Sequence, residues 1–277
     1  MNASSRRSSF PAWSWLWFLL GVAYFVLPLY ATLDFSLRMK RDVISLAAYQ
    51  RALADPEFIS SFLYSNLIAV VTIFAGILII VPTAYWIRLR LPQARRIVEF
   101  ITLLPFVVPA IILVFGLIQV YGSPLRLPFT SIVLIPALTN NDLGTNVLLV
   151  AGYVILALPY MYRSVDTGLR SMDVRTLTEA AQSLGAGWLT IMLRLILPNL
   201  RAALLSGALL TFAIVIGEVT LASFLNVPVF GPYLWLLGQH RAYEPAALSF
   251  ASFLLTWAAM GVIQWITGGQ GQAAGAH

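Results

Sequence analysis

The chain of 277 residues contains no cysteine, two histidines and a single lysine, and only 10% of its residues are charged. Without cysteine it can form no disulfides, thiolate metal sites, iron–sulfur clusters or thiol nucleophiles. The lysine, Lys40, follows Met39 rather than a glycine, so there is no Walker A sequence and the chain cannot itself be a P-loop ATPase. We therefore expect no catalytic site, no metal site and no cofactor.

Apolar residues make up 60% of the chain, whereas an ordinary soluble protein has about 45–50% apolar and about 25% charged residues. One protein core cannot bury this excess, so lipid is the expected solvent. Spanning a bilayer takes about 20 mostly apolar residues. Six windows qualify, over residues 13–33, 62–87, 99–121, 144–162, 200–223 and 246–266. The sequence therefore predicts an all-α polytopic membrane protein with six transmembrane helices.

The first window has one feature of a signal peptide, because Arg6 and Arg7 precede its apolar run. The run continues to Leu33, beyond the roughly 7–15 residues of a signal peptide's apolar region, and no small-residue cleavage site closes it. We interpret it as a retained span.

Basic residues are divided unevenly between the two sides that six spans would create. With the N-terminus inside, 11 of the 17 lie in cytoplasmic segments, which ordinarily hold the excess. The cytoplasmic set is Arg6, Arg7, Arg88, Arg90, Arg95, Arg96, Arg163, Arg170, Arg175, Arg194 and Arg201, and the outer set is Arg38, Lys40, Arg41, Arg51, Arg126 and Arg241. Both termini are therefore predicted to be cytoplasmic. These bases form no continuous stripe, so membrane lipid and not nucleic acid is the expected partner.

The most informative segment lies in the cytoplasmic loop between the fourth and fifth windows. Four apolar residues recur there at the spacing of an α-helix. The four are Val174, Leu177, Ala181 and Leu184. Gly185 and Gly187 are expected to end this helix and form a turn, and a second helical run follows from Trp188 to Pro198. Such a helix–glycine–helix segment presents a compact surface that another protein can bind.

This segment resembles the EAA signature of the membrane subunits of bacterial binding-protein-dependent ABC importers. The signature reads Glu-Ala-Ala, three residues, Gly, nine residues and Ile-x-Leu-Pro. Here Glu179, Ala180 and Ala181 are followed at the same spacing by Gly185 and then by residues 195–198. One position departs, since Leu195 replaces the isoleucine, which is a conservative change. The family places this loop before the last two of six core spans, as in this chain.

The resemblance implies a type I ABC importer permease fold in a bacterial inner membrane, without a catalytic role. In the family this loop contains the coupling helix that seats in a groove of the ATP-binding subunit. The docking residues by position are Glu179, Ala180, Ala181, Gly185 and Arg175. The implied partners are two ATP-binding subunits, a second permease subunit and an extracytoplasmic solute-binding protein. The implied division is a tail over 1–12, a first span and outer loop over 13–61, a core over 62–266 with the coupling loop over 164–198, and a tail over 267–277.

Simpler interpretations exist for two of these residues. Glu179 stands three residues after Thr176, which is the spacing of a capping box, so its carboxylate could satisfy backbone N–H groups. Gly185 by itself could be an ordinary helix C-cap. Both roles are compatible with docking.

Glu218 is the main candidate for the solute pathway, because an ionisable side chain within a span usually faces a water-filled cavity or a partner. The alternative is that it lies at the outer end of its span and meets water. Asn66 and Gln119 are further candidates, for which hydrogen bonding between packed helices is the alternative.

The sequence favours a permease that imports a small polar solute, with a polyamine preferred. The preference follows from the acidic Glu218 and from a resemblance to the spermidine/putrescine, iron(III) and phosphonate permeases. Phosphonate or iron(III) remain alternatives. An ion-coupled secondary transporter is the alternative from another class, although no inverted repeat is visible. An intramembrane enzyme would need a catalytic constellation that the residues present do not supply.

Overall fold

The computed structural model describes residues 12–40, 43–126 and 133–273. Most of the predicted N-terminal tail, with Arg6 and Arg7, and the predicted outer base Arg41 lie outside this range. The elements in chain order are α1 (Ala12–Leu37), α2 (Ala47–Leu53), α3 (Pro56–Arg90), η1 (Pro92–Ala94), α4 (Arg95–Val107), α5 (Ala110–Tyr121), β1 (Leu125–Arg126), β2 (Val133–Ile135), η2 (Leu138–Asn140), α6 (Asp142–Arg170), α7 (Val174–Ser183), α8 (Trp188–Ile191), η3 (Met192–Ile196), α9 (Leu197–Asn199), α10 (Arg201–Gly217), α11 (Thr220–Phe224), α12 (Phe230–His240) and α13 (Tyr243–Ala273).

The described helices account for five of the six predicted windows by length and composition. Three helices are long and apolar enough to cross a membrane, over Trp13–Leu37, Pro56–Arg90 and Asp142–Arg170. Counting each of two bent helix pairs as one span raises the number to five within the described residues. Helix α13 covers the sixth window, but the count of six spans stays a prediction.

The chain divides into two compact units. The smaller unit comprises residues 1–55 and 236–257. In it the hydroxyl oxygens of Ser36 and Tyr49 lie 2.8 Å apart, which joins α1 to α2, and the ring of Phe35 stacks on that of Tyr243 at 4.8 Å between centroids. The most apolar window of α1 has no buried residue. Its surface is therefore suited to contact with lipid.

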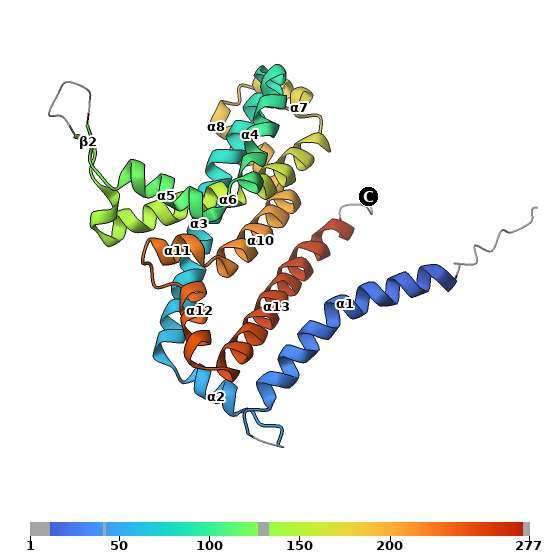
Figure 1. Cartoon of the computed structure of the whole chain (residues 1–277). Helices are drawn as coiled ribbons and strands as arrows, with labels where there is room; N and C mark the ends of the chain where they lie inside the picture. The colour runs from blue at the N-terminus through green and yellow to red at the C-terminus, as the bar shows by residue number, and fades with distance from the viewer. Residues whose placement is uncertain (1–11, 41–42, 127–132, 274–277) are drawn as a thin grey trace, which may run out of the picture. The chain divides into compact units, whose positions relative to one another are not determined.

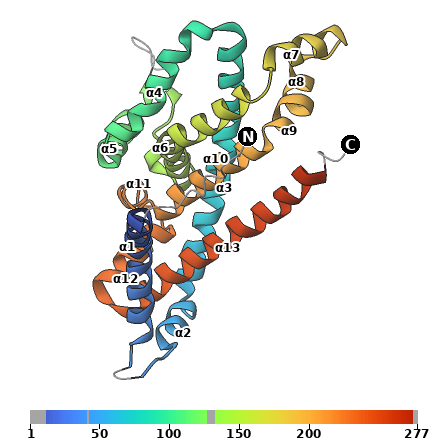
Figure 2. The ribbon, with the colours of Figure 1, turned by 90° about the vertical axis from the view of Figure 1, so that its right-hand side faces the viewer.

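The larger unit comprises residues 56–235 and 258–277, and its core is formed where α3, α6 and α10 pack against one another (Figure 1 and Figure 2). One buried cluster gathers around Tyr85, Met161 and Ile196, and a second gathers around Tyr153, Leu149 and Leu221. Helices α6 and α10 approach closely at Gly207, where a Cβ atom would lie 2.6 Å from the Met161 sulfur. Small residues allow such close packing of membrane helices.

Two predicted continuous windows are broken in the structure. The window over 99–121 consists of α4 and α5, and the helical segments on either side of the break are bent by 104°. Val108 is extended there because the ring of Pro109 disfavours the helical conformation in the preceding residue. The window over 200–223 likewise ends its first helix at Gly217, and Glu218 lies extended before α11.

The stretch between α5 and α6 contains a small antiparallel ladder. Leu125 pairs with Ile135, and Arg126 pairs with Val133. These short strands and η2 lead the chain into α6, so they modify an otherwise helical fold only locally.

Candidate functional site

Helix α7 begins with a different cap from the one that the sequence suggested. The Asp173 carboxylate accepts hydrogen bonds from the backbone N–H of Thr176 at 3.3 Å and from its hydroxyl at 2.6 Å. Asp173 therefore precedes the helix as its N-cap. The predicted capping box between Thr176 and Glu179 is wrong, because the Glu179 carboxylate instead accepts a hydrogen bond from Arg175 at 2.9 Å.

The hydrogen bond from the Thr176 hydroxyl lowers the pKa of Asp173 below its usual value. A carboxyl whose pKa is lowered by folding stabilises the folded form above its ordinary pKa and loses that effect as the pH falls through the lowered value. The cap is therefore fully charged at neutral pH.

The two faces of α7 have different surroundings. Arg175 and Glu179 have side chains that are 82% and 62% exposed, and Ala180 is exposed beside them. Val174 is buried on the other face, and Ala181 packs partly buried against the same core cluster. Three of the predicted docking residues, Arg175, Glu179 and Ala180, thus lie on the open face of α7. Ala181 instead faces the buried core cluster.

A buried hydrogen bond holds α7 to the end of α3. The hydroxyl oxygens of Tyr85 and Thr178 lie 3.0 Å apart, and the Thr178 hydroxyl donates to the backbone oxygen of Val174 at 2.6 Å. Because a threonine hydroxyl has one proton, Tyr85 must be the donor in the first of these bonds. Sequence reasoning missed this contact, which joins residues 93 positions apart.

The turn after α7 confirms the predicted helix stop at Gly185. The φ of Gly185 is +81°, in the left-handed region that favours glycine. The backbone N–H of Gly185 donates to Gln182, and that of Ala186 donates to Ala181. Leu184, just before the turn, is 89% exposed. The turn therefore presents an apolar side chain beside the charged open face of α7.

A cleft of about 300 Å³ adjoins this contact between α7 and the end of α3. Trp86, Leu89 and Arg90 line it from α3, and Trp188 lines it from α8. The α3 residues were not predicted as part of this site. The sequence signal that could have indicated them is the presence of Trp86 and Arg90 at the end of a predicted span.

The Glu218 carboxylate occupies the break between α10 and α11. It accepts the backbone N–H of Thr220 at 2.7 Å and that of Leu221 at 2.9 Å, and the residue is half-buried. The buried side chain of Tyr153 on α6 interacts electrostatically with this carboxylate. Glu218 therefore caps a short helix and places a negative charge within the larger unit.

The other two predicted pathway residues lie in different surroundings. The Asn66 amide donates to the backbone oxygen of Phe62 at 2.7 Å, within its own helix. Gln119 lines a cleft of about 480 Å³ together with Thr139 and Thr145. A neighbouring cleft of about 430 Å³ shares these two threonines and is rich in asparagine. Among the described residues, no group of His, Asp and Glu could hold a metal ion.

A family model described as the binding-protein-dependent transport system inner membrane component matches residues 80–269. Among curated proteins, a ferric transport system permease of Haemophilus influenzae, named as putative, is 29% identical over 68% of this chain. A molybdate/tungstate permease of Pyrococcus furiosus is 29% identical over 65%, and a spermidine/putrescine permease of Escherichia coli is 25% identical over 67%. The matches span 27%, 65% and 73% of these relatives, respectively.

A solved structure has the same fold. A chain of a bacterial ABC transporter involved in the import of the acidic polysaccharide alginate superimposes with a TM-score of 0.66 at 16% identity. The superposition covers 94% of this chain and 96% of that one. The predicted all-α importer permease fold is thereby confirmed.

Proposed function

We propose that this chain, which belongs to the family of binding-protein-dependent transport system inner membrane components, is the permease subunit of an ATP-driven importer. The observation that supports this most directly is the segment from α7 to α8, which presents an exposed charged face and a left-handed glycine turn. We refer to residues 174–191 as the coupling segment. It would receive motion from an ATP-binding subunit, since the chain has no Walker A sequence of its own.

The proposed docking surface consists of the exposed Arg175, Glu179 and Ala180 with the turn at Gly185. Ala181 would support this surface from behind, because it packs toward the core cluster. A second permease subunit, two ATP-binding subunits and a solute-binding protein complete the proposed assembly. The core over residues 62–266 and the coupling loop over 164–198 are part of this proposal.

A polyamine is the solute that we favour. Glu218 is the one carboxylate between Ala202 and His240, and a negative charge near a pathway attracts a cation. One relative is a spermidine/putrescine permease, whereas others are permeases for ferric iron and for molybdate or tungstate. Iron(III) remains an alternative that the ferric relative supports, and phosphonate remains an alternative from the sequence resemblance alone. Mass spectrometry of the ligand bound to the cognate solute-binding protein would identify the solute.

Co-purification and uptake test the proposed function. The chain should co-purify with an ATP-binding subunit, and vesicles containing the assembled complex should import solute only with ATP and the solute-binding protein. A secondary transporter would instead import without an ATPase, driven by an ion gradient. Uptake by this chain alone would contradict our proposal.

The proposed orientation places both termini in the cytoplasm, and reporter fusions test it. Fusions after Arg90 and Arg175 are expected to report the cytoplasm, and fusions at Arg51, Arg126 and Arg241 the opposite side, because bases are concentrated in cytoplasmic loops. Compartment-specific reporter activity is the measurement. A cytoplasmic signal at Arg126 would remove a pair of spans and, with them, the placement of the coupling segment.

A further inference from the structure

Four charged side chains form a closed ring between α4 and α6, which we call the ion-pair ring: Arg95, Glu99, Asp166 and Arg170. Within α4, Arg95 contacts Glu99 at 2.9 Å, and within α6, Arg170 contacts Asp166 at 2.6 Å. Across the two helices, Arg95 reaches Asp166 at 3.3 Å and Arg170 reaches Glu99 at 3.1 Å. Each arginine therefore contacts both carboxylates.

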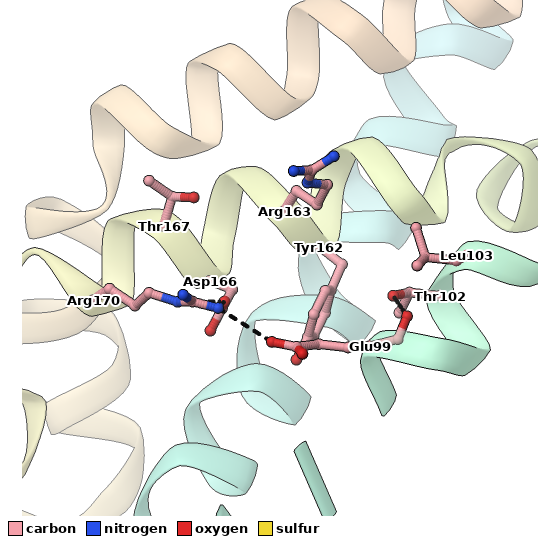
Figure 3. Close-up of a pocket in the computed structure, with 8 residues that line it drawn as sticks. All are labelled: Glu99, Thr102, Leu103, Tyr162, Arg163, Asp166, Thr167 and Arg170. Atoms are coloured by element: carbon pink, nitrogen blue, oxygen red, sulfur yellow. Dashed lines mark hydrogen bonds and ion pairs between the residues drawn. The ribbon is translucent and has the colours of Figure 1, made fainter. Parts of the chain in front are cut away.

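The ring is anchored at Asp166. Its side chain is only 13% exposed, and Arg88 at the end of α3 contacts it from 3.6 Å. Figure 3 shows Arg170 and Asp166 on α6 directed toward Glu99 on α4, whereas Arg163 points away from Glu99. A pocket of about 390 Å³ adjoins the ring. The other three side chains are 37–51% exposed, so water reaches most of the ring.

Helix α4 has few other attachments to the larger unit. Thr102 is its one buried residue, and Val98 packs partly buried against the core cluster. The ring of Phe106 meets that of Tyr160 edge-on at 5.3 Å. Large apolar side chains of α4 such as Phe100 and Val107 are 67% and 78% exposed. The charged ring is therefore a major contact that sets the position of α4 on α6.

The α6 side of the ion-pair ring lies directly before the coupling segment in the chain. Arg170 is the last residue of α6, and α7 begins at Val174. Val174 lies in the same buried cluster as Leu169 of α6 and Tyr85 of α3. Because this packing is apolar and buried, α7 and the end of α6 should move together.

We propose that the ion-pair ring makes α4 follow the end of α6 when the coupling segment moves, so that ATP-driven motion reaches α4 and α5. This inference rests on the proposed function of the chain as an importer permease. Isolated exposed ion pairs add little to stability, but several charges in one network can contribute more, and Asp166 in this network is only 13% exposed. Beyond the break at Val108 and Pro109, the chain continues into α5, where Gln119 lines an outer cleft. The four ring residues are thus positioning residues for transport.

The test uses the double variant Arg95→Gln with Glu99→Gln, which removes both ring contacts from α4 to α6 and leaves the net charge unchanged. Because the chain has no cysteine, Ile97→Cys on α4 and Ser183→Cys on α7 give two defined spin-label sites when the partner subunits are also cysteine-free. The distance between the labels is measured by double electron–electron resonance. Nucleotide-free and vanadate-trapped complexes are compared, and spermidine uptake and ATP hydrolysis are measured in vesicles.

With the ring intact, we expect the same narrow distance distribution in both states. In the double variant the distribution should broaden or depend on the state, and uptake should fall by about tenfold while ATP hydrolysis stays within about twofold, as expected for loss of a coupling free energy. The matched control is Asp34→Asn with Arg38→Gln, which removes a local ion pair between residues four positions apart at the end of α1. This control should retain both wild-type readouts.

Two results would overturn the proposal. One is a distance that changes between states in the complex with an intact ring, since α4 would then not follow the coupling segment. The other is a double variant that retains either the narrow distribution or wild-type uptake. Failure of the unmodified chain to assemble with an ATPase would instead contradict the proposed function. If the unmodified complex assembles but does not import spermidine, the distances still test the ring.

Discussion

Replacing Gly185 by valine is expected to weaken docking of the ATP-binding subunit by about tenfold and to reduce uptake in proportion. The φ of +81° is a conformation that L-residues rarely adopt, and no atom lies within 4 Å of a Cβ built at this position. The effect would therefore come from the backbone alone. A left-handed conformation costs about 1–2 kcal/mol in an L-residue, and about 1.4 kcal/mol corresponds to tenfold in binding. Co-purification yield and vesicle uptake are the measurements.

Two further variants separate backbone strain from a general sensitivity of this turn. Asparagine tolerates positive φ, so Gly185→Asn should retain most of the docking. Gly187 has an ordinary φ of −75° and also has open space around it. Because serine is a favourable N-cap residue, Gly187→Ser should behave as wild type. Full docking and uptake in Gly185→Val would show that the coupling assignment is wrong.

Replacing Glu218 by glutamine is expected to lower the affinity of the pathway for a cationic solute by roughly tenfold to a hundredfold. Losing a charge-assisted hydrogen bond costs roughly 1.5–3 kcal/mol, and about 1.4 kcal/mol corresponds to tenfold. Glutamine retains a side-chain oxygen that can accept the N–H groups of Thr220 and Leu221, so α11 should remain capped. Basal ATP hydrolysis should persist because the coupling segment is unchanged. Spermidine uptake against loaded solute-binding protein is the measurement.

Glu218→Ala provides the comparison, since it removes both the charge and the cap. Loss of a cap typically costs about 1 kcal/mol, so the alanine variant should have a lower melting temperature than the glutamine variant. Unchanged uptake in Glu218→Gln, with only Glu218→Ala destabilised, would leave Glu218 as a structural cap. The polyamine preference would then depend on resemblance alone.

Features that depend on local chemistry were predicted from the sequence. The excess of apolar residues implies a lipid environment whichever helices pack together, and the windows over 62–87 and 144–162 both lie within single helices. The stop at Gly185 also followed from local chemistry, because glycine readily adopts the positive φ that ends a helix. The spacing around Glu179 indicated the family without knowledge of any tertiary contact.

Features that depend on how helices meet were decided by the tertiary structure. Glu99 and Arg170 are 71 positions apart in the chain, as are Arg95 and Asp166, and each residue has a nearer partner four positions away. Their sequence spacing predicts only the local pairs, because side chains on separate helices meet only when packing sets the distance between the helix axes. The same reason explains why the contact between Tyr85 and Thr178 was not predicted. Glu218 differs from these, because its contacts are local but the uniformly apolar window did not reveal the break: the sequence placed Glu218 in a span, whereas in the structure its carboxylate caps α11 through residues two and three positions away.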